Sequence, residues 1–324
     1  MKIISLLLSL LVVGCSSSPK KGELREWMEP SGKLKVLATT AFVQDLVQKV
    51  GGDHIDTLTL IKGDLDPHSY QLVKGDDEKL GFANLIFYNG LGLEHSPSIY
   101  LALVHNPRAI ALGGEIEKAR PDVILTFGHD VDPHIWTDVS LWKLSIPSIV
   151  QALSERDPVH AEDYRLRGQK AYRELDQLDH EVEDIVHQIP EEKRFLVTSH
   201  DAFNYFSRRY LATDEEKEDG SWQKRFQAPE GLSPDSQLSP HQIQNLIDHL
   251  QHYKVEVLFP ETNLSPDSIL KIVDAGNKKG LTVKMSTTPL YGDAMGPKGS
   301  DGDTYEKMML HNAKMIRNGL TGTQ

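Results

Sequence analysis

The sequence predicts an α/β protein of two lobes, each with a largely parallel sheet, joined by one long rigid helix. Three observations lead to this fold class. Short apolar, β-branched runs alternate with helical patterns in both halves of the chain, as in sheets covered by helices. Residues 157–190 form one helical pattern that is longer than a single lobe needs. The length of 324 residues fits two domains.

The N-terminus has the pattern of a lipoprotein signal. Lys2 precedes an apolar run from Ile3 to Val13, which is too short to span a bilayer and ends at Gly14-Cys15. Cys15 is the only cysteine, so the chain can form no internal disulfide, and its place favours acylation. We expect a signal peptide over 1–14, lipidation of Cys15, and a polar tether over 15–32. The mature protein is then exported and lipid-anchored at the membrane, on its periplasmic or extracellular face.

The first lobe is expected over residues 33–156. An apolar run at 34–40 predicts a strand, and the spacing of Phe42, Leu46, Val47 and Val50 predicts a helix that ends at Gly51-Gly52. Residues 55–61 alternate as a second strand, and a helix begins near Gly75 and Asp76. Further strands are expected at 85–88, 109–112 and 123–127.

The connecting helix is the most strongly patterned segment. Asp157 is a suitable N-cap, Pro158 suits the first helical position, and apolar residues follow at helical spacing up to Ile189. The charged residues between them indicate a solvated face.

The second lobe is expected over 191–324, where the alternation resumes. Strands are expected at 195–199, 255–259 and 281–286, and helices at 202–210, 240–253, 266–278 and 303–318. Residues 214–239 are polar and rich in charge, Gly, Ser and Pro, which predicts an extended surface loop.

The charge of the chain excludes one class of partner. The formal net charge is −12 at pH 7, whereas a nucleic-acid-binding protein would carry clustered basic residues. An acidic surface suits a protein that gathers cations. We expect a monomer with no nucleic-acid partner.

The tripeptide Asp-Pro-His occurs twice, at 66–68 and at 132–134. Proline fixes its own φ and favours an extended conformation of the residue before it, so each histidine follows a stiff turn. The neighbouring aspartate can accept a hydrogen bond from an imidazole or a backbone N–H, which is how metal-binding histidines are commonly held. One such tripeptide alone would indicate a surface turn.

A third histidine, His200, also follows an expected strand. His68, His134 and His200 therefore lie at carboxyl edges of the two lobes, where α/β sheets bind ligands. Glu261 and Asp293 follow two further strands of the second lobe and compete for a fourth position. Three imidazoles and one carboxylate suit a divalent transition metal such as Zn²⁺, Mn²⁺ or Fe²⁺, in the cleft between the lobes. Because an imidazole must be neutral to bind a metal, the affinity should fall below about pH 6.5.

At these residues the sequence resembles bacterial solute-binding protein family 9, the lipoprotein receptors that pass zinc, manganese or iron to ABC importers. The matching stretches span the mature chain in order: 63–70, 87–94, 132–136, 199–206, 291–296 and 305–312. The resemblance implies that His68, His134, His200 and Asp293 are the metal ligands and that the partner is an ABC permease in the membrane. We interpret Glu261 as a residue that orients a ligand.

The sequence departs from the family pattern in two places. Zinc-specialised members often carry a long histidine-rich loop between the first two ligands, whereas this interval has only the scattered His95, His105 and His129. This argues against a dedicated zinc role. The stretch from Asp214 to Ser239 is also longer than the usual connection after the third ligand.

Two other functions fit parts of the same pattern. A zinc hydrolase would keep a water in the fourth position and use Glu261 as general base. An adhesion lipoprotein would use the metal only to stabilise its fold. The resemblance instead favours a receptor that is not an enzyme and whose metal is its cargo.

Overall fold

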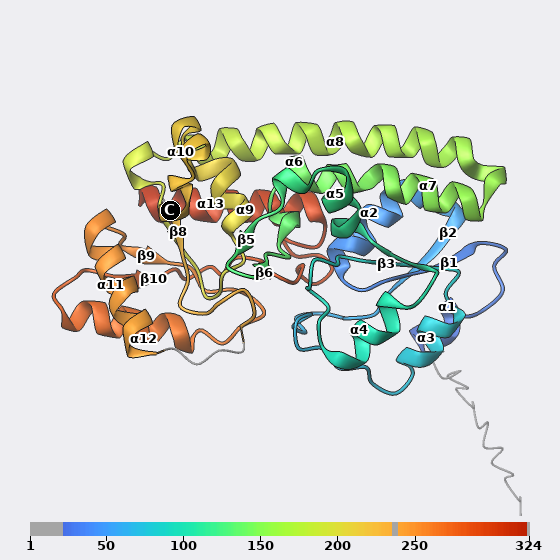
Figure 1. The fold of residues 1–324 in the computed structure, drawn as a ribbon, viewed down its shortest axis with the longest axis horizontal. Helices are drawn as coiled ribbons and strands as arrows, with labels where there is room; N and C mark the ends of the chain where they lie inside the picture. Colours follow the sequence, from blue (N-terminus) through green and yellow to red (C-terminus); the bar gives the residue numbers. More distant parts are fainter. Residues whose placement is uncertain (1–21, 235–238, 323–324) are drawn as a thin grey trace, which may run out of the picture.

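The structure is a computed structural model that describes residues 22–234 and 239–322. The predicted signal peptide, Cys15 and the first part of the predicted tether lie outside these residues. Two α/β halves lie side by side, and the long helix α8 runs along both of them (Figure 1). None of the helices in the described part of the chain is long and apolar enough to cross a membrane.

The first half contains a four-stranded parallel sheet in the order β2-β1-β3-β4. Its strands are β1 (Leu34–Ala38), β2 (Ile55–Thr59), β3 (Leu85–Tyr88) and β4 (Ala109–Ala111). Alternate residues of β1 face opposite sides, since Val36 and Ala38 belong to one hydrophobic cluster and Leu37 to another. The first cluster contains α2 (Ala41–Gly51), and the second contains residues of α3 (Asp76–Phe82) and α4 (Pro97–Val104).

The predicted strand at 123–127 does not join this sheet. Pro121–Val123 form a 3₁₀ turn, and β5 (Thr126–Phe127) pairs antiparallel with β6 (Asp130–Val131). Gly128, with φ of 67°, begins the two-residue turn of this hairpin. The proline and the glycine therefore leave a short hairpin in front of the second Asp-Pro-His.

The chain is folded before residue 33, within the predicted tether. Residues Glu23–Trp27 form α1, and Trp27 is buried with its Nε1–H donating to the Asp56 carbonyl at 2.9 Å. The aromatic side chain fastens this segment to β2.

The second half has parallel strands that are shorter than the sequence suggested. The strands β7 (Leu196–Val197), β9 (Val257–Leu258) and β10 (Lys284–Met285) contain two residues each, and β9 pairs with β10. A parallel bridge between Thr198 and Phe259 places β7 beside β9. The surrounding helices include α11 (Pro240–Tyr253), α12 (Asp267–Lys278) and α13 (Tyr305–Thr321).

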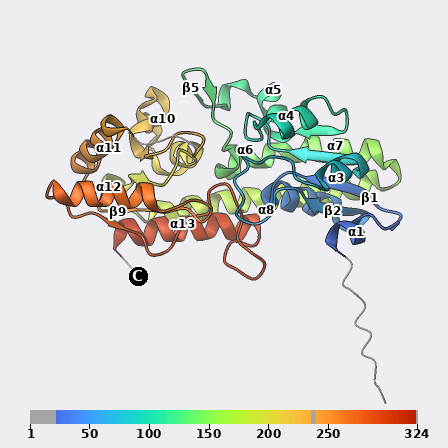
Figure 2. The ribbon, with the colours of Figure 1, turned by 90° about the horizontal axis from the view of Figure 1, so that it is seen from below.

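Helix α8 (Ala161–His187) packs against elements of both halves. It contacts α2 and α7 (Ile146–Arg156) of the first half and α13 of the second, and Figure 2 shows α8 and α13 side by side. Its start differs from the prediction, because Pro158–His160 form a 3₁₀ turn before it. Asp157 instead accepts hydrogen bonds from Tyr164 Oη at 2.7 Å and from His160 Nδ1 at 2.6 Å.

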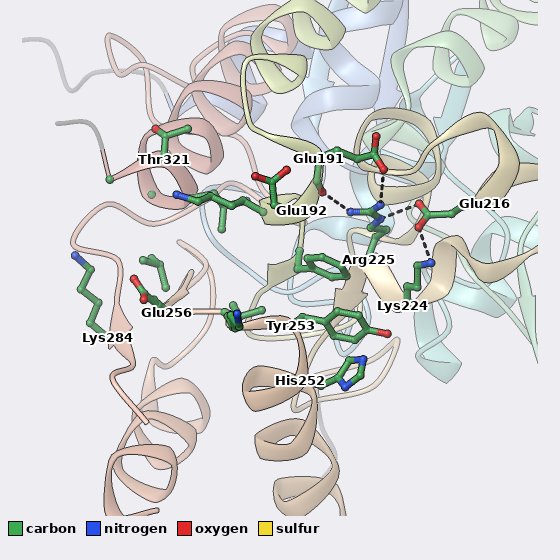
Figure 3. Close-up of a pocket in the computed structure, with 18 residues that line it drawn as sticks. Glu191, Glu192, Glu216, Lys224, Arg225, His252, Tyr253, Glu256, Lys284 and Thr321 are labelled. Atoms are coloured by element: carbon green, nitrogen blue, oxygen red, sulfur yellow. Dashed lines mark hydrogen bonds and ion pairs between the residues drawn. The ribbon is translucent and has the colours of Figure 1, made fainter. Parts of the chain in front are cut away.

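The prediction of an extended loop at 214–239 was wrong for most of its length. The segment contains α10 (Asp214–Asp219), a 3₁₀ helix (Ser221–Arg225) and β8 (Phe226–Gln227), which pairs in parallel with β7. Its polar residues stabilise this structure, since Thr213 and Glu216 form a capping box at the start of α10. Arg225 lies between Glu216 and Glu191 (Figure 3), with Arg225 Nε 2.8 Å from Glu216 Oε2.

Candidate metal centre

Four side chains from the two halves converge on one point. His68, His134, His200 and Asp293 are buried, and one ligand atom from each lies within 4.8 Å of the others. His134 Nε2 lies 3.3 Å from His68 Nε2 and 3.5 Å from Asp293 Oδ1. Asp293 Oδ2 lies 3.1 Å from His200 Nε2 and 3.6 Å from His68 Nε2.

The first Asp-Pro-His turn holds the backbone of His68. Asp66 Oδ1 accepts the His68 backbone N–H at 2.9 Å, and Asp66 Oδ2 accepts the N–H of Ser69 at 3.2 Å. The aspartate thus closes the turn after β2 and does not touch the imidazole.

In the second Asp-Pro-His turn the aspartate also orients the ring. Asp132 Oδ1 accepts the backbone N–H of His134 at 2.9 Å and lies 2.7 Å from His134 Nδ1. Asn204 Nδ2 donates to Asp132 Oδ2 at 3.0 Å. A proton on Nδ1 leaves the Nε2 lone pair free to point at the other ligands.

Glu261 does the same for His200. Glu261 Oε1 accepts the His200 backbone N–H at 3.0 Å, and Oε2 lies 2.8 Å from His200 Nδ1. Both oxygens face His200, and Glu261 is outside the group of four whose atoms converge.

The loop that carries Asp293 needs glycine at position 292. A Cβ on Gly292 would lie 2.1 Å from Glu261 Oε2 and 3.5 Å from His200 Cε1. The loop is fixed by Trp136 Nε1, which donates to the Gly292 carbonyl at 3.1 Å, and by Asn312, which bonds the N–H and C=O of Tyr291. Trp136 comes from the first half, so the loop is fastened to both halves.

The electrostatics of the cluster follow from burial and from its own charges. Burial lowers the pKa of His68 to about 3. Burial would also lower the pKa of His200, but Asp293 and Glu261 raise it well above its usual value. Burial would raise the pKa of Asp293, but the three histidines, His200 foremost, hold it below its usual range. The metal-free cluster is therefore a buried His200–Asp293 ion pair with a neutral His68.

The donor atoms fit a transition-metal ion. Within the described residues, both oxygens of Asp293 are buried and form no hydrogen bond of good geometry, although Oδ2 lies 3.1 Å from His200 Nε2. A bound cation would satisfy these oxygens. The Nε2 atoms of His68 and His134 face each other. If both present lone pairs, these repel each other unless a cation lies between them. Three imidazoles and a carboxylate form a four-ligand set for Zn²⁺, Mn²⁺ or Fe²⁺.

The three scattered histidines between the first two proposed ligands are not part of this group of four. His105 and His129 are exposed, and His95 has its ring centroid 5.6 Å from that of His68 while its Nδ1 lies 3.1 Å from the Gly92 carbonyl. The structure adds a residue that sequence reasoning missed, because Ser233 Oγ lies 3.2 Å from His68 Nδ1. No motif marks Ser233, and only the path of residues 226–233 brings it there.

A cavity of about 750 Å³ lies elsewhere in the second half (Figure 3). It is lined by residues before β7 and β9 and at the start of β10, among them Phe195, Val255 and Lys284. These are the amino ends of the strands, whereas His200 and Asp293 follow carboxyl ends. The cavity is therefore separate from the cluster.

Comparison with known proteins gives consistent similarities. Residues 36–319 match the family model of zinc-uptake complex component A, periplasmic (ZnuA). The chain is 35% identical to the metal-binding protein YtgA of Chlamydia muridarum, over 97% of this chain and 92% of that protein. It is 33% identical to the manganese-binding lipoprotein MntA of Bacillus subtilis, over 89% and 90%.

Solved structures show the same similarity. Fe(III)-bound YtgA from Chlamydia trachomatis matches with a TM-score of 0.84 and 35% identity, over 89% of this chain and 98% of that one. The periplasmic zinc-binding protein TroA from Treponema pallidum matches with a TM-score of 0.80 and 30% identity, over 89% and 99%.

Proposed function

This chain belongs to the ZnuA family of periplasmic metal-uptake components, and we propose that it captures a divalent transition-metal ion and delivers it to an ABC permease. His68, His134, His200 and Asp293 are the proposed ligands. The metal is the cargo, an ion of the class that includes Mn²⁺, Zn²⁺ and Fe²⁺. The names of the relatives cover manganese, zinc and iron, and three histidines with one aspartate are compatible with each.

One observation carries this proposal. Four buried side chains, from loops of both halves, present ligand atoms within 4.8 Å of one another. Since these atoms lie between two halves, binding links the halves directly, as a receptor that must distinguish loaded from empty requires.

The arrangement disfavours a zinc hydrolase. Four protein ligands complete a tetrahedral shell and leave no open position for an activated water. Glu261, the candidate general base, has both oxygens engaged with His200. Metal-loaded protein should therefore leave ester and phosphate substrates intact.

The name of one relative and the N-terminal sequence support a location at the membrane. MntA of Bacillus subtilis is named a lipoprotein, and Cys15 follows an apolar run in this chain. We propose that a lipid on Cys15 holds the monomeric receptor at the outer face of the cytoplasmic membrane, next to its permease.

Competition titrations with Zn²⁺ and Mn²⁺ test the ligand set. Single alanine variants of His68, His134, His200 and Asp293 should each lose at least about a hundredfold in affinity, more than replacement of residues that only orient ligands. His241→Ala, which changes an exposed histidine of α11, is the matched control and should bind as the wild type does. Wild-type affinity in two or more of the ligand variants would exclude this site.

A further inference from the structure

Each imidazole of the cluster has a partner at Nδ1, and one partner differs from the others. His134 and His200 face the carboxylates of Asp132 and Glu261. His68 faces the hydroxyl of Ser233 at 3.2 Å. We propose that Ser233 is the positioning residue of His68, and that residues 226–233, here called the strap, set the rate at which the metal leaves. This inference rests on the proposed function of the site.

The strap lies beside the loop that carries His200 and forms hydrogen bonds with it. Beyond the β7–β8 pairing, Thr198 N–H donates to the Gln227 carbonyl at 3.4 Å. Glu230 N–H donates to the Ser199 carbonyl at 3.3 Å, and Asp201 N–H donates to the Gly231 carbonyl at 3.2 Å. The strap therefore moves with the third ligand, in the second half of the molecule.

At its far end the strap contacts the other half. Ser233 meets His68, which follows β2, so one continuous segment connects a ligand loop of the second half to a ligand of the first. The base of the strap is also well held, because Arg225, directly before it, donates to Glu216 and to the Glu191 carbonyl at 2.6 Å (Figure 3). Separation of the halves would break the Ser233–His68 contact while leaving the strap attached to the His200 loop.

The chemistry of the hydroxyl determines its role. For His68 Nε2 to bind the metal, the proton must lie on Nδ1, and Ser233 Oγ then accepts a hydrogen bond from this N–H. A neutral hydroxyl fixes this tautomer but raises the basicity of the ring less than a carboxylate does. Among the three histidines, His68 is therefore the ligand with the weakest support and the first to be released.

Removal of the hydroxyl tests the role directly. In Ser233→Ala the Nδ1–H of a nearly buried ring, 2% exposed, loses its acceptor. Replacement of such supporting residues commonly weakens binding by about 10- to 100-fold, and we expect Zn²⁺ transfer to a chelator to accelerate by about that factor. Ser233→Thr keeps the hydroxyl and should release at a rate near that of the wild type. Ser221→Ala, in the 3₁₀ helix before the strap, where the Ser221 backbone N–H donates to Asp219, is the matched control.

A spectroscopic measurement separates positioning from general loosening. In the Zn²⁺-loaded wild type, ¹⁵N NMR of labelled histidine should show a slowly exchanging proton on His68 Nδ1. This proton should exchange rapidly in Ser233→Ala, while the Nδ1 proton of His134 stays protected. Unchanged release and unchanged protection in Ser233→Ala would overturn the role of Ser233. Failure of the wild type to bind Zn²⁺ or Mn²⁺ at all would instead overturn the proposed function.

Discussion

At the scale of residues, the metal-free cluster carries a proton that must leave when the metal binds. The pKa of His200 is raised well above its usual value, because Asp293 and Glu261 outweigh the effect of burial, so this ring is protonated at neutral pH. His68 is neutral, since burial lowers its pKa to about 3. An imidazolium cannot bind a cation, so binding must release the His200 proton.

This predicts that metal affinity already depends on pH at neutrality. A group whose pKa is raised in the empty site holds its proton throughout the range below that pKa, so affinity should fall by about tenfold per unit of decreasing pH. The pH range over which affinity changes therefore lies above the pKa of about 6.5 expected for an unperturbed histidine. Calorimetry at pH 7 in buffers of different ionisation enthalpy should show about one proton released per Zn²⁺. Glu261→Gln should reduce that number, and a wild-type value of zero would contradict the ion pair.

Local motifs made most of this site predictable. Both Asp-Pro-His turns are marked by adjacent residues, and each aspartate accepts the backbone N–H of its histidine. Asp132, two residues from its histidine, orients the ring as expected of a neighbouring aspartate, and the contacts of Glu261 with His200 agree with its interpretation as an orienting residue. Ser233 could not be predicted as a partner of His68 Nδ1, because it arrives from a distant segment. Spacing along the chain carries no information about such contacts.

Asp45 on α2 is half-buried, and one oxygen of its carboxyl group is shielded from solvent. Burial raises its pKa to about 6, with Glu306 and Asp303 adding to the effect and Lys49 opposing it. The unfolded chain ionises near pH 3.8, so stability falls as the pH rises from about 4 to 6, and the full penalty remains above pH 6. Asp45→Asn should therefore be more stable at pH 7.5 by about 1 to 3 kcal/mol.

Urea denaturation of the metal-free protein at two pH values measures this effect. The gain of Asp45→Asn should shrink at pH 4.5, where the wild-type carboxyl is itself protonated. The same substitution at the exposed Asp184 of α8 is the control. A gain equal at both pH values would mean that the charge of Asp45 is not its cause.

At the scale of elements, the contact between α7 and α8 depends on a residue without a side chain. A Cβ on Gly168 of α8 would lie 2.4 Å from Val150 Cγ2 of α7. Gly168→Ala must push the two helices apart or move Val150, and overpacking of this kind costs about 1 to 3 kcal/mol. Gly81→Ala on α3 has nothing within 4 Å of the new Cβ, so it should stabilise by about 0.5 to 1 kcal/mol through its helix propensity.

Thermal unfolding of the two variants beside the wild type tests this contrast, because the same substitution is made in two helices. The melting temperature should fall for Gly168→Ala and rise for Gly81→Ala. A similar change in both would show that helix propensity, not the α7–α8 contact, decides the outcome.

The elements also show where prediction from sequence ends. Alternation and helical spacing located β1, β2, β3, α2 and α13, because each buries one face of a regular pattern. The inserted segment at 214–227 was missed, since its order comes from a capping box, an ion pair of Arg225 with Glu216, and the burial of Trp222. Polar composition resembles a loop whether the charges are solvated or paired.

At the scale of the whole molecule, we expect a fold that does not depend on the metal ion. Three hydrophobic clusters fill both halves, and the largest includes residues of α2, α8 and α13. The residues His68, His134, His200 and Asp293 lie between the halves, in loops that follow strands. Since a helix that spans both halves already holds them, we expect the metal-free protein to be folded.

The last prediction distinguishes a receptor from a protein in which the metal is structural. After treatment with a chelator, the protein should still unfold in a cooperative transition. Because a ligand stabilises only the state that binds it, Zn²⁺ at about a thousandfold excess over its dissociation constant should add about 4 kcal/mol. Asp293→Asn keeps the shape of the side chain but weakens the ligand, so it should melt cooperatively without metal and gain much less from Zn²⁺. If the wild type loses its unfolding transition in chelator, the metal holds the fold together, and the molecule cannot be a receptor that waits empty for its ion.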